Sequence, residues 1–146
     1  MKPKAILLVE DNESDVALTR RALAKCQVDN PLIVVEDGQE ALDYLFGAGV
    51  HEGRDLTEQP ALILLDLNLP RVDGLTVLRR IRESTTTRRL PVVILTTSLE
   101  ASDLATAYDA GVNSYLRKPI DFEQFARTMA SLTHYWLALN ERPPLP

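Results

Sequence analysis

The chain has 146 residues, which fits one domain and leaves too little chain for a second folded unit of ordinary size. Its composition, 45% hydrophobic and 25% charged, argues against a disordered, collagen-like or membrane-spanning protein. The formal net charge of −5 opposes the attraction to phosphates that nucleic-acid binding needs. Because there is no export signal and no apolar stretch of about 18 residues, we expect one cytoplasmic domain, residues 1–146, that binds neither nucleic acid nor membrane.

Five short segments predict β-strands. They cover residues 5–9, 32–35, 61–65, 92–95 and 114–116. The first four are continuously apolar, which is typical of strands buried on both faces of a parallel sheet, and the fifth is weaker.

Segments with helical periodicity lie between the strands. Their apolar markers are Val16, Leu23 and Cys26, then Ala41, Leu42 and Leu45, then Leu75, Leu78 and Ile81, and finally Leu104 and Tyr108, where Gly111 ends the helix. This alternation predicts right-handed crossovers and an α/β fold, a doubly wound five-stranded parallel sheet with its core at about residues 3–132. Residues 47–59 are expected to form a long solvated loop, and residues 133–146 a C-terminal extension.

The last helix is the longest, and its apolar residues recur at steps of three and four. The stripe consists of Phe122, Phe125, Met129, Leu132, Trp136 and Leu139. A helix over residues 122–139 would be about 27 Å long, whereas a typical strand is about 17 to 20 Å. We expect the first part of the stripe to pack on the sheet and Trp136 and Leu139 to extend beyond it. Because exposed large apolar side chains mark association surfaces, these two residues predict a homodimer, with residues 140–146 as an arm across the partner.

Polar residues follow the strands directly, where the ligand site of an open α/β sheet lies. They are Glu10 and Asp11, Asp66, Thr96, Thr97 and Ser98, and Arg117, Lys118 and Pro119. Clustered carboxylates repel one another unless a cation compensates. Mg²⁺ accepts carboxylates together with phosphate oxygens, and Lys118 suits a phosphoryl oxygen as a point charge. The pattern predicts a magnesium-dependent phosphoryl site.

Residues 66–74, which follow the third strand, decide among several possible kinds of functional site. They fail as a calcium loop because Pro70 occupies the position of the third oxygen ligand. A haloacid-dehalogenase-type phosphatase with Asp66 as nucleophile is an alternative, but Asn68 stands where its general acid belongs. A flavodoxin-like flavin carrier is a further alternative, although Glu10 and its neighbour would repel a flavin phosphate. A phospho-accepting aspartate without efficient turnover, a switch rather than a hydrolase, fits best, and Asp73 is expected to be the turn and cap of the next helix.

Together these segments resemble the receiver domain of two-component response regulators. The matching motifs are residues 7–11, 66–70, 73–74, 95–98 and 118–119. The resemblance covers residues 3–132 and implies the flavodoxin-like receiver fold, with strand order 2-1-3-4-5. It also implies a signalling domain rather than an enzyme, one that catalyses only its own phosphorylation and dephosphorylation.

The resemblance implies roles for individual residues. Asp66 would be the phosphorylation site, attacking a phosphohistidine to give an acyl phosphate. The implied Mg²⁺ ligands are Glu10, directly or through water, Asp11, Asp66 and the backbone carbonyl of Asn68. The implied catalytic and switch residues are Thr96 and Lys118, which bind phosphoryl oxygens, and Tyr115, the aromatic switch. The Lys118–Pro119 peptide is cis in the family, so a cis bond is expected here.

Some segments are also similar to the single-domain regulators that partner bacterial and cyanobacterial phytochrome histidine kinases. These segments are the long loop before the third strand and residues 60–70, 112–116 and 135–137. This similarity implies a histidine kinase partner, with phytochrome kinases as candidates. Only one helix and a short tail follow Lys118, so output is expected to be contact with a downstream protein, transfer to a phosphotransfer protein or a change in self-association.

Overall fold

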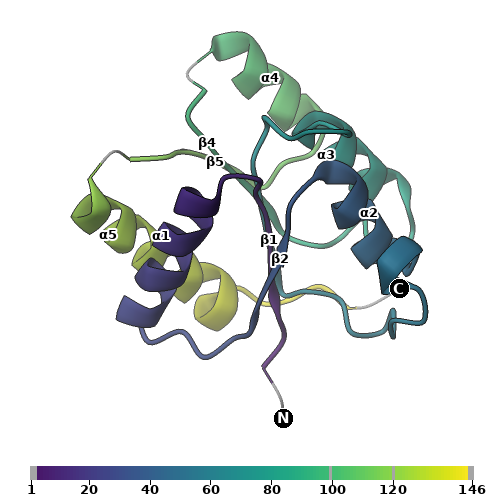
Figure 1. The fold of residues 1–146 in the computed structure, drawn as a ribbon, viewed down its shortest axis with the longest axis horizontal. Helices are drawn as coiled ribbons and strands as arrows, with labels where there is room; N and C mark the ends of the chain where they lie inside the picture. The colour runs from purple at the N-terminus through teal and green to yellow at the C-terminus, as the bar shows by residue number, and fades with distance from the viewer. Residues whose placement is uncertain (1–2, 99, 120, 145–146) are drawn as a thin grey trace.

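The computed structural model describes residues 3–98, 100–119 and 121–144, which form an open sheet with helices on both faces (Figure 1). The strands are β1 (Ile6–Val9), β2 (Leu32–Val35), β3 (Leu62–Leu65), β4 (Val92–Thr96) and β5 (Ser114–Arg117). The helices are α1 (Glu13–Lys25), α2 (Gly38–Phe46), α3 (Gly74–Glu83), α4 (Ala101–Asp109) and α5 (Phe122–Thr133), with a 3-10 turn, η1 (Gly49–His51), and a π-helix, η2 (His134–Leu139). Within these described ranges, no helix is long and apolar enough to cross a membrane.

The five strands are parallel and lie in the order β2-β1-β3-β4-β5, which confirms the predicted fold class and strand order. β1, β3 and β4 are buried along their whole length, as their continuous apolar sequences predict. β2 and β5 are edge strands that are only partly buried, which explains the weaker apolar signal of β5. Because parallel strands end at the same edge, the residues that follow them gather there.

Two apolar cores cover the two faces of the sheet, because alternate residues of a strand point to opposite sides. Leu7 and Val9 of β1 pack with α2, α3 and α4, whereas Ile6 and Leu8 pack with α1 and α5. Figure 1 shows these two helix layers on opposite sides of the strands. Each fully buried aliphatic side chain contributes about 1.5 to 3 kcal/mol relative to an exposed one, so both layers hold the sheet in place.

Polar residues in the loops that precede the helices cap their first turns. Asn12, Asp37, Asp73 and Asp121 each accept a hydrogen bond from a backbone N–H at the start of α1, α2, α3 and α5 respectively. The predicted cap at Asp73 is therefore confirmed. After α4, Gly111 adopts a φ of +97°, the left-handed conformation that its position at a helix end predicts.

The fourth helix packs differently from the prediction. Leu104 and Tyr108, which were expected to mark its inner face, are 41% and 52% exposed. The residue of α4 that is buried is Ala107, which lies against the core of α2 and α3. Two apolar residues four positions apart share a helix face, but this spacing does not decide that the face is turned inward.

The C-terminal helix is α-helical only to Thr133 and continues as a π-helix, so the single α-helix predicted over residues 122–139 is wrong in its last part. Up to Leu132 its apolar stripe packs on the sheet as expected. Trp136 does not extend beyond the domain but packs, partly buried, against the core shared with α1, whereas Leu139 is 60% exposed. Trp136 follows Leu132 by four residues, about one helical turn, so the stripe continues onto this core as far as Trp136.

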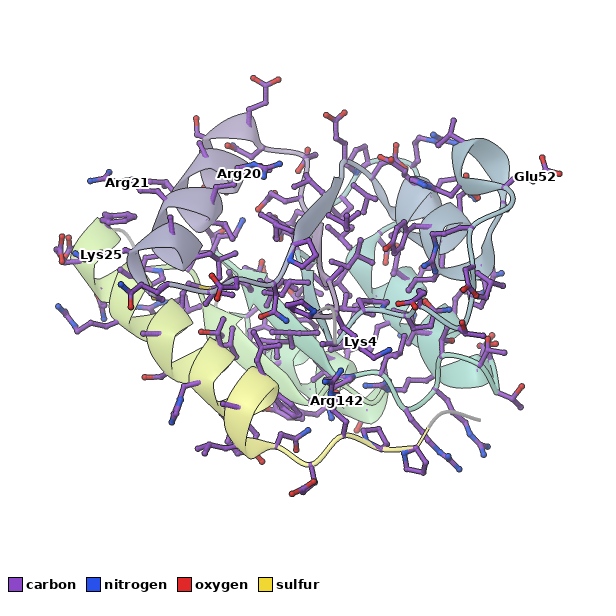
Figure 2. All side chains as sticks on the ribbon, turned by 90° about the horizontal axis from the view of Figure 1, so that it is seen from below. Lys4, Arg20, Arg21, Lys25, Glu52 and Arg142 are labelled. Atoms are coloured by element: carbon purple, nitrogen blue, oxygen red, sulfur yellow. The ribbon has the colours of Figure 1, made fainter. Side chains whose placement is uncertain are left out.

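The C-terminal tail lies on its own domain. Residues 141–144 cross the amino edge of the sheet, which Figure 2 shows from below. Arg89 donates a hydrogen bond to the backbone carbonyl of Pro144 at 3.1 Å, and Lys4 and Arg142 line the same shallow cavity. Residues 141–144 therefore contact their own chain, the last two residues of the predicted arm lie outside the described ones, and the arm across a partner stays a prediction.

Residues 47–59 are mostly exposed, as expected for a solvated loop, but Arg54 and Gln59 anchor them to the domain. Arg54 stacks over the ring of Tyr44 at 3.9 Å and donates hydrogen bonds to the Tyr44 carbonyl and the Gln59 side chain. Gln59 is buried and donates in turn to the carbonyl of Leu45. The planar guanidinium, which offers five donors, thus fastens the loop to α2.

Candidate functional site

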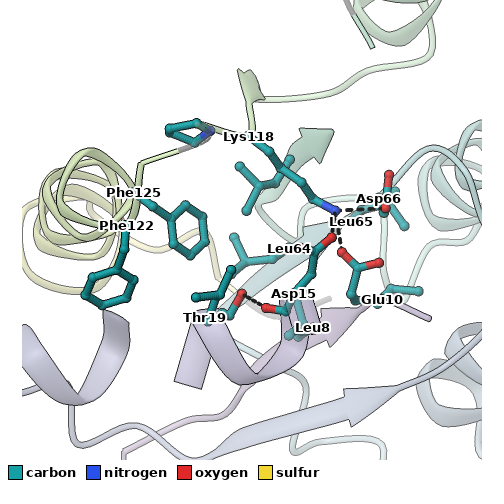
Figure 3. Close-up of a pocket in the computed structure, with 14 residues that line it drawn as sticks. Leu8, Glu10, Asp15, Thr19, Leu64, Leu65, Asp66, Lys118, Phe122 and Phe125 are labelled. Carbon is teal, nitrogen blue, oxygen red and sulfur yellow. Dashed lines mark hydrogen bonds and ion pairs between the residues drawn. The ribbon is translucent and has the colours of Figure 1, made fainter. Parts of the chain in front are cut away.

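Residues from separate parts of the chain meet at the carboxyl edge of the sheet (Figure 3). Glu10 and Asp11 follow β1, Asp66 follows β3, and Lys118 follows β5. Carboxylate oxygens of Glu10, Asp11 and Asp66 lie within 4.8 Å of one another, and we call these three residues the acidic cluster. Asp15, in the first turn of α1, lies beside them. The structure therefore brings together the acids and the lysine that the sequence predicted.

The ammonium group of Lys118 donates hydrogen bonds to three carboxylates. Its distances are 2.5 Å to Glu10, 2.9 Å to Asp15 and 3.1 Å to Asp66. Burial by itself lowers the pKa of Lys118, but its hydrogen bonds to Asp15 and Glu10 outweigh burial and raise that pKa above its usual value. Lys118 is therefore a fixed positive charge among the acids.

Glu10 is the most buried of these acids, with a side chain that is 3% exposed. A cavity of about 70 Å³ adjoins it, lined mainly by apolar side chains of β1, β3, β4 and α5. Burial raises the pKa of Glu10 from 4.5 to about 7, although the hydrogen bond from Lys118 acts in the opposite direction. In the absence of a metal ion, a full negative charge on Glu10 is thus costly.

Asp66 is held from both sides of its carboxylate. One oxygen accepts the backbone N–H of Asn68 at 3.2 Å, and the other accepts Lys118. Gly74, the first residue of α3, lies so close that a Cβ there would be 2.3 Å from the carbonyl oxygen of Asp66. Only glycine permits this approach, so the start of α3 fixes the backbone that carries Asp66.

Thr96 and Tyr115 lie on the β4–β5 side of the site. Thr96 is fully buried, and its hydroxyl accepts the backbone N–H of Ser98 at 3.4 Å. The Tyr115 hydroxyl donates to the backbone carbonyl of Ser98, also at 3.4 Å, and the Ser98 hydroxyl bonds to Asp103 at 2.6 Å. Tyr115 therefore contacts the connection between β4 and α4 rather than the acidic cluster.

Asp15 was missed by the sequence analysis, although it lies nearer to Lys118 than Asp66 does. A carboxylate in the first turn of a helix has an ordinary explanation, because it stabilises the positive end of the helix dipole. The signal that would have found it is its place in the first turn of the helix that follows β1, since a helix that starts there presents this turn to the carboxyl edge.

The Lys118–Pro119 peptide was expected to be cis, and this prediction is wrong for the structure, which has no cis peptide bond among the described residues. The trans form is intrinsically preferred before proline, by about 0.5 to 1 kcal/mol. Lys118 reaches its carboxylate partners with the bond in this form.

The acidic cluster fits a divalent cation. Its donors are carboxylate oxygens, which are the ligands that Mg²⁺ and Mn²⁺ prefer. Two of the three acids are buried and Asp11 is exposed, so an ion there would keep a side open to water or phosphate.

An open parallel α/β sheet has its ligand site at its carboxyl edge, and the acidic cluster and lysine found there suit a divalent cation and phosphoryl oxygens. The model of the response regulator receiver domain matches residues 6–130. The chain belongs to this family, as its motifs indicated.

Relatives and solved structures agree with this assignment. The probable methanogenesis regulatory protein FilR2 of Methanothrix harundinacea is 46% identical over 143 residues, which cover 97% of this chain and 88% of that protein. Response regulator Rcp1 of Synechocystis is 38% identical over 135 residues, or 92% of this chain and 90% of Rcp1. The phosphorylated cyanobacterial phytochrome response regulator RcpA matches with a TM-score of 0.89 at 39% identity, covering 97% of this chain and 99% of that one. A Mn²⁺-bound form of Rcp1 matches with a TM-score of 0.88 at 37% identity, covering 97% and 100%.

Glu10→Gln should remove a pH dependence of stability from the metal-free protein. Because the pKa of Glu10 is raised to about 7, folding favours its protonated form, and wild-type stability falls as pH rises from 4.5 through about 7. We expect a loss of about 1 to 3 kcal/mol relative to the variant. Urea unfolding in EDTA between about pH 5 and pH 7.5 measures it.

Glu13→Gln, which changes an exposed acid of α1, is the control and should follow the wild type. A wild-type curve as flat as that of Glu10→Gln would contradict the raised pKa.

Proposed function

We propose that this chain, residues 1–146, is a stand-alone cytoplasmic response regulator that accepts a phosphoryl group from a histidine kinase on Asp66, with Mg²⁺ as cofactor. The observation that supports this most directly is the position of Asp66. Its side chain is 10% exposed, bonds to Lys118 at 3.1 Å and belongs to the acidic cluster. An acid that is shielded from water and has a cation beside it is suited to accept a phosphoryl group.

The carboxylates of the acidic cluster and the backbone carbonyl of Asn68 would hold the Mg²⁺ ion, with Glu10 binding directly or through water. When bound, the ion would neutralise charge on the phosphoryl oxygens. The Mn²⁺-bound form of Rcp1, which is 37% identical to this chain, supports a divalent ion in this family.

A carboxylate oxygen of Asp66 would attack the phosphorus atom of a phosphohistidine. A P–O bond forms, the P–N bond breaks, and the imidazole nitrogen keeps the electron pair and takes a proton. Lys118 and the hydroxyl of Thr96 would bind phosphoryl oxygens of the acyl phosphate. The Thr96 hydroxyl accepts a hydrogen bond from Ser98, so its proton is available to donate. Slow attack by water would return Asp66, so the chain would catalyse only its own phosphorylation and dephosphorylation.

The signal would leave the site through Ser98. The Ser98 N–H donates to the Thr96 hydroxyl, and the Ser98 carbonyl accepts a hydrogen bond from the Tyr115 hydroxyl. If the Thr96 hydroxyl turned toward a phosphoryl group, Ser98 would shift and its hydrogen bond with Tyr115 would change. Tyr115 would act as the switch, and the altered surface would bind a downstream protein or a phosphotransfer protein.

We propose a phytochrome kinase as the phosphodonor. The support is the similarity to RcpA, a phytochrome response regulator, over 97% of this chain. The phosphatase alternative is not supported, because the chain belongs to the receiver family and Asn68 gives Asp66 a backbone N–H and not a carboxyl group.

Asp66→Asn should abolish labelling by acetyl phosphate, because an amide is not a nucleophile for phosphorus. The metal-free variant should be at least as stable as wild type, since it loses one of several mutually repelling carboxylates. Labelling and thermal unfolding in EDTA measure the two effects. Asp73→Asn, which can keep the cap of α3, is the control and should be labelled normally. Equal labelling of Asp66→Asn would exclude Asp66 as the acceptor, and a much lower melting temperature would contradict the repulsion.

Mg²⁺ should stabilise the wild type by about 1.4 kcal/mol when the free ion is roughly tenfold above its dissociation constant. Ca²⁺ should stabilise it less, because it prefers larger and looser coordination. Thermal unfolding with and without metal measures the shift, and Asp11→Ala should reduce it. Glu52→Ala is the control, because Glu52 is an exposed acid of the loop before β3 and does not belong to the acidic cluster. A shift of full size in Asp11→Ala would exclude Asp11 as a ligand.

We also propose that the chain forms a homodimer through the C-terminal end of α5 and η2. Leu139 is 60% exposed and Tyr135 is 49% exposed. The rings of Tyr135 and Trp136 pack edge to face at 5.0 Å, beside a groove that runs along β5. These residues give the end of the helix an apolar surface, which supports association.

Leu139→Glu and Trp136→Ala should shift the protein toward monomer, the first by placing a charge in the interface and the second by removing apolar area. Sedimentation velocity over a micromolar concentration range measures this. Val50→Glu is the matched control, because Val50 is an 85% exposed apolar residue elsewhere on the surface. A wild type that is monomeric throughout refutes the dimer, and a dimer that survives Leu139→Glu refutes this surface.

A further inference from the structure

Lys118 has one carboxylate partner that lies outside the acidic cluster. Asp15 accepts a hydrogen bond from it at 2.9 Å. The Asp15 side chain is 34% exposed, compared with 3% for Glu10 and 10% for Asp66. Figure 3 shows Asp15 reaching the ammonium from α1, whereas Asp66 reaches it from the end of β3.

The backbone of Asp15 is fixed on both sides. Its N–H donates to the side chain of Asn12 at 3.0 Å, and its carbonyl accepts the hydroxyl of Thr19 at 2.8 Å. Its carboxylate therefore approaches Lys118 from a capped helical turn rather than from a free loop. The helix dipole accounts for an acid at this position, but not for its contact with a buried lysine.

The number of donors on Lys118 limits what the site can bind. An ammonium group has three N–H donors, and the three carboxylates use all of them. A phosphoryl oxygen on Asp66 can be bound only if Lys118 leaves one of its partners. Asp15 is the most exposed of the three, so water can replace its lost hydrogen bond at the least cost.

We propose that Asp15 is a positioning residue that holds Lys118 on the α1 side of the site in the unphosphorylated protein and releases it to the phosphoryl group. This role rests on the proposed phosphorylation of Asp66. Asp15 competes with a phosphoryl group for Lys118, and its negative charge also repels the phosphoryl group. The same negative charge attracts a divalent cation into the acidic cluster.

Asp15→Asn removes the charge and keeps the shape of the side chain, so it should change two affinities in opposite directions. Affinity for Mg²⁺ alone should fall about twofold, and affinity for beryllofluoride, a phosphoryl analogue, should rise about fivefold at saturating Mg²⁺, the size expected for one partly exposed charge pair. A residue that served only to start α1 would weaken both affinities when replaced.

Calorimetric titration of the full chain with Mg²⁺, and then with beryllofluoride at saturating Mg²⁺, provides the test. Glu13→Gln is the matched control, since it removes an exposed charge from the same helical turn. Opposite shifts in Asp15→Asn, relative to Glu13→Gln, support the proposal. If wild type binds beryllofluoride but Asp15→Asn shows any other pattern, the role of Asp15 is overturned and the proposed function is not. A wild type that does not bind beryllofluoride overturns both.

Discussion

One ammonium group shared by several carboxylates governs the carboxyl edge of this protein. Lys118 reaches Glu10, Asp15 and Asp66, yet its single charge cannot neutralise them together with nearby Asp11. Burial is the main cause of the raised pKa of Glu10, and the excess of negative charge adds to it through nearby Asp66, although Lys118 acts in the opposite direction. The same excess makes the site suitable for a divalent cation. Burial and this unbalanced set of charges together raise the proton affinity of Glu10 and suit the site to a metal ion.

The order of the strands creates this charge imbalance. β1 and β3 are neighbours, so the acids that follow them are placed together by the sheet itself. Lys118 comes from β5, which is separated from β3 by β4, and its long side chain is what spans that distance. The buried apolar strands carry no chemistry of their own, but their register determines which charged groups can meet.

The sequence predicted those parts that depend on strand periodicity and on the positions just after strands. The five strands, their helices and the acidic cluster with Lys118 were found in this way. The role of Asp15 was hidden because a helix start explains an acid there equally well. Tertiary contacts decide the remaining features: Trp136 packs against the core of its own domain, and the tail lies on that domain too. Such contacts leave no periodic trace in a single sequence.

The close approach of Gly74 to Asp66 makes the site mechanically asymmetric. On that side the start of α3 is in direct contact with the backbone of the acceptor, so the two are clamped together. On the other side α4 buries Ala107 alone, and Ser98 is joined to Thr96 and Tyr115 by hydrogen bonds of 3.4 Å. Local opening costs least where few apolar contacts are buried. A displacement of Asp66 would therefore meet more resistance from α3 than from α4. The fold thus favours movement on the β4–α4 side of the molecule.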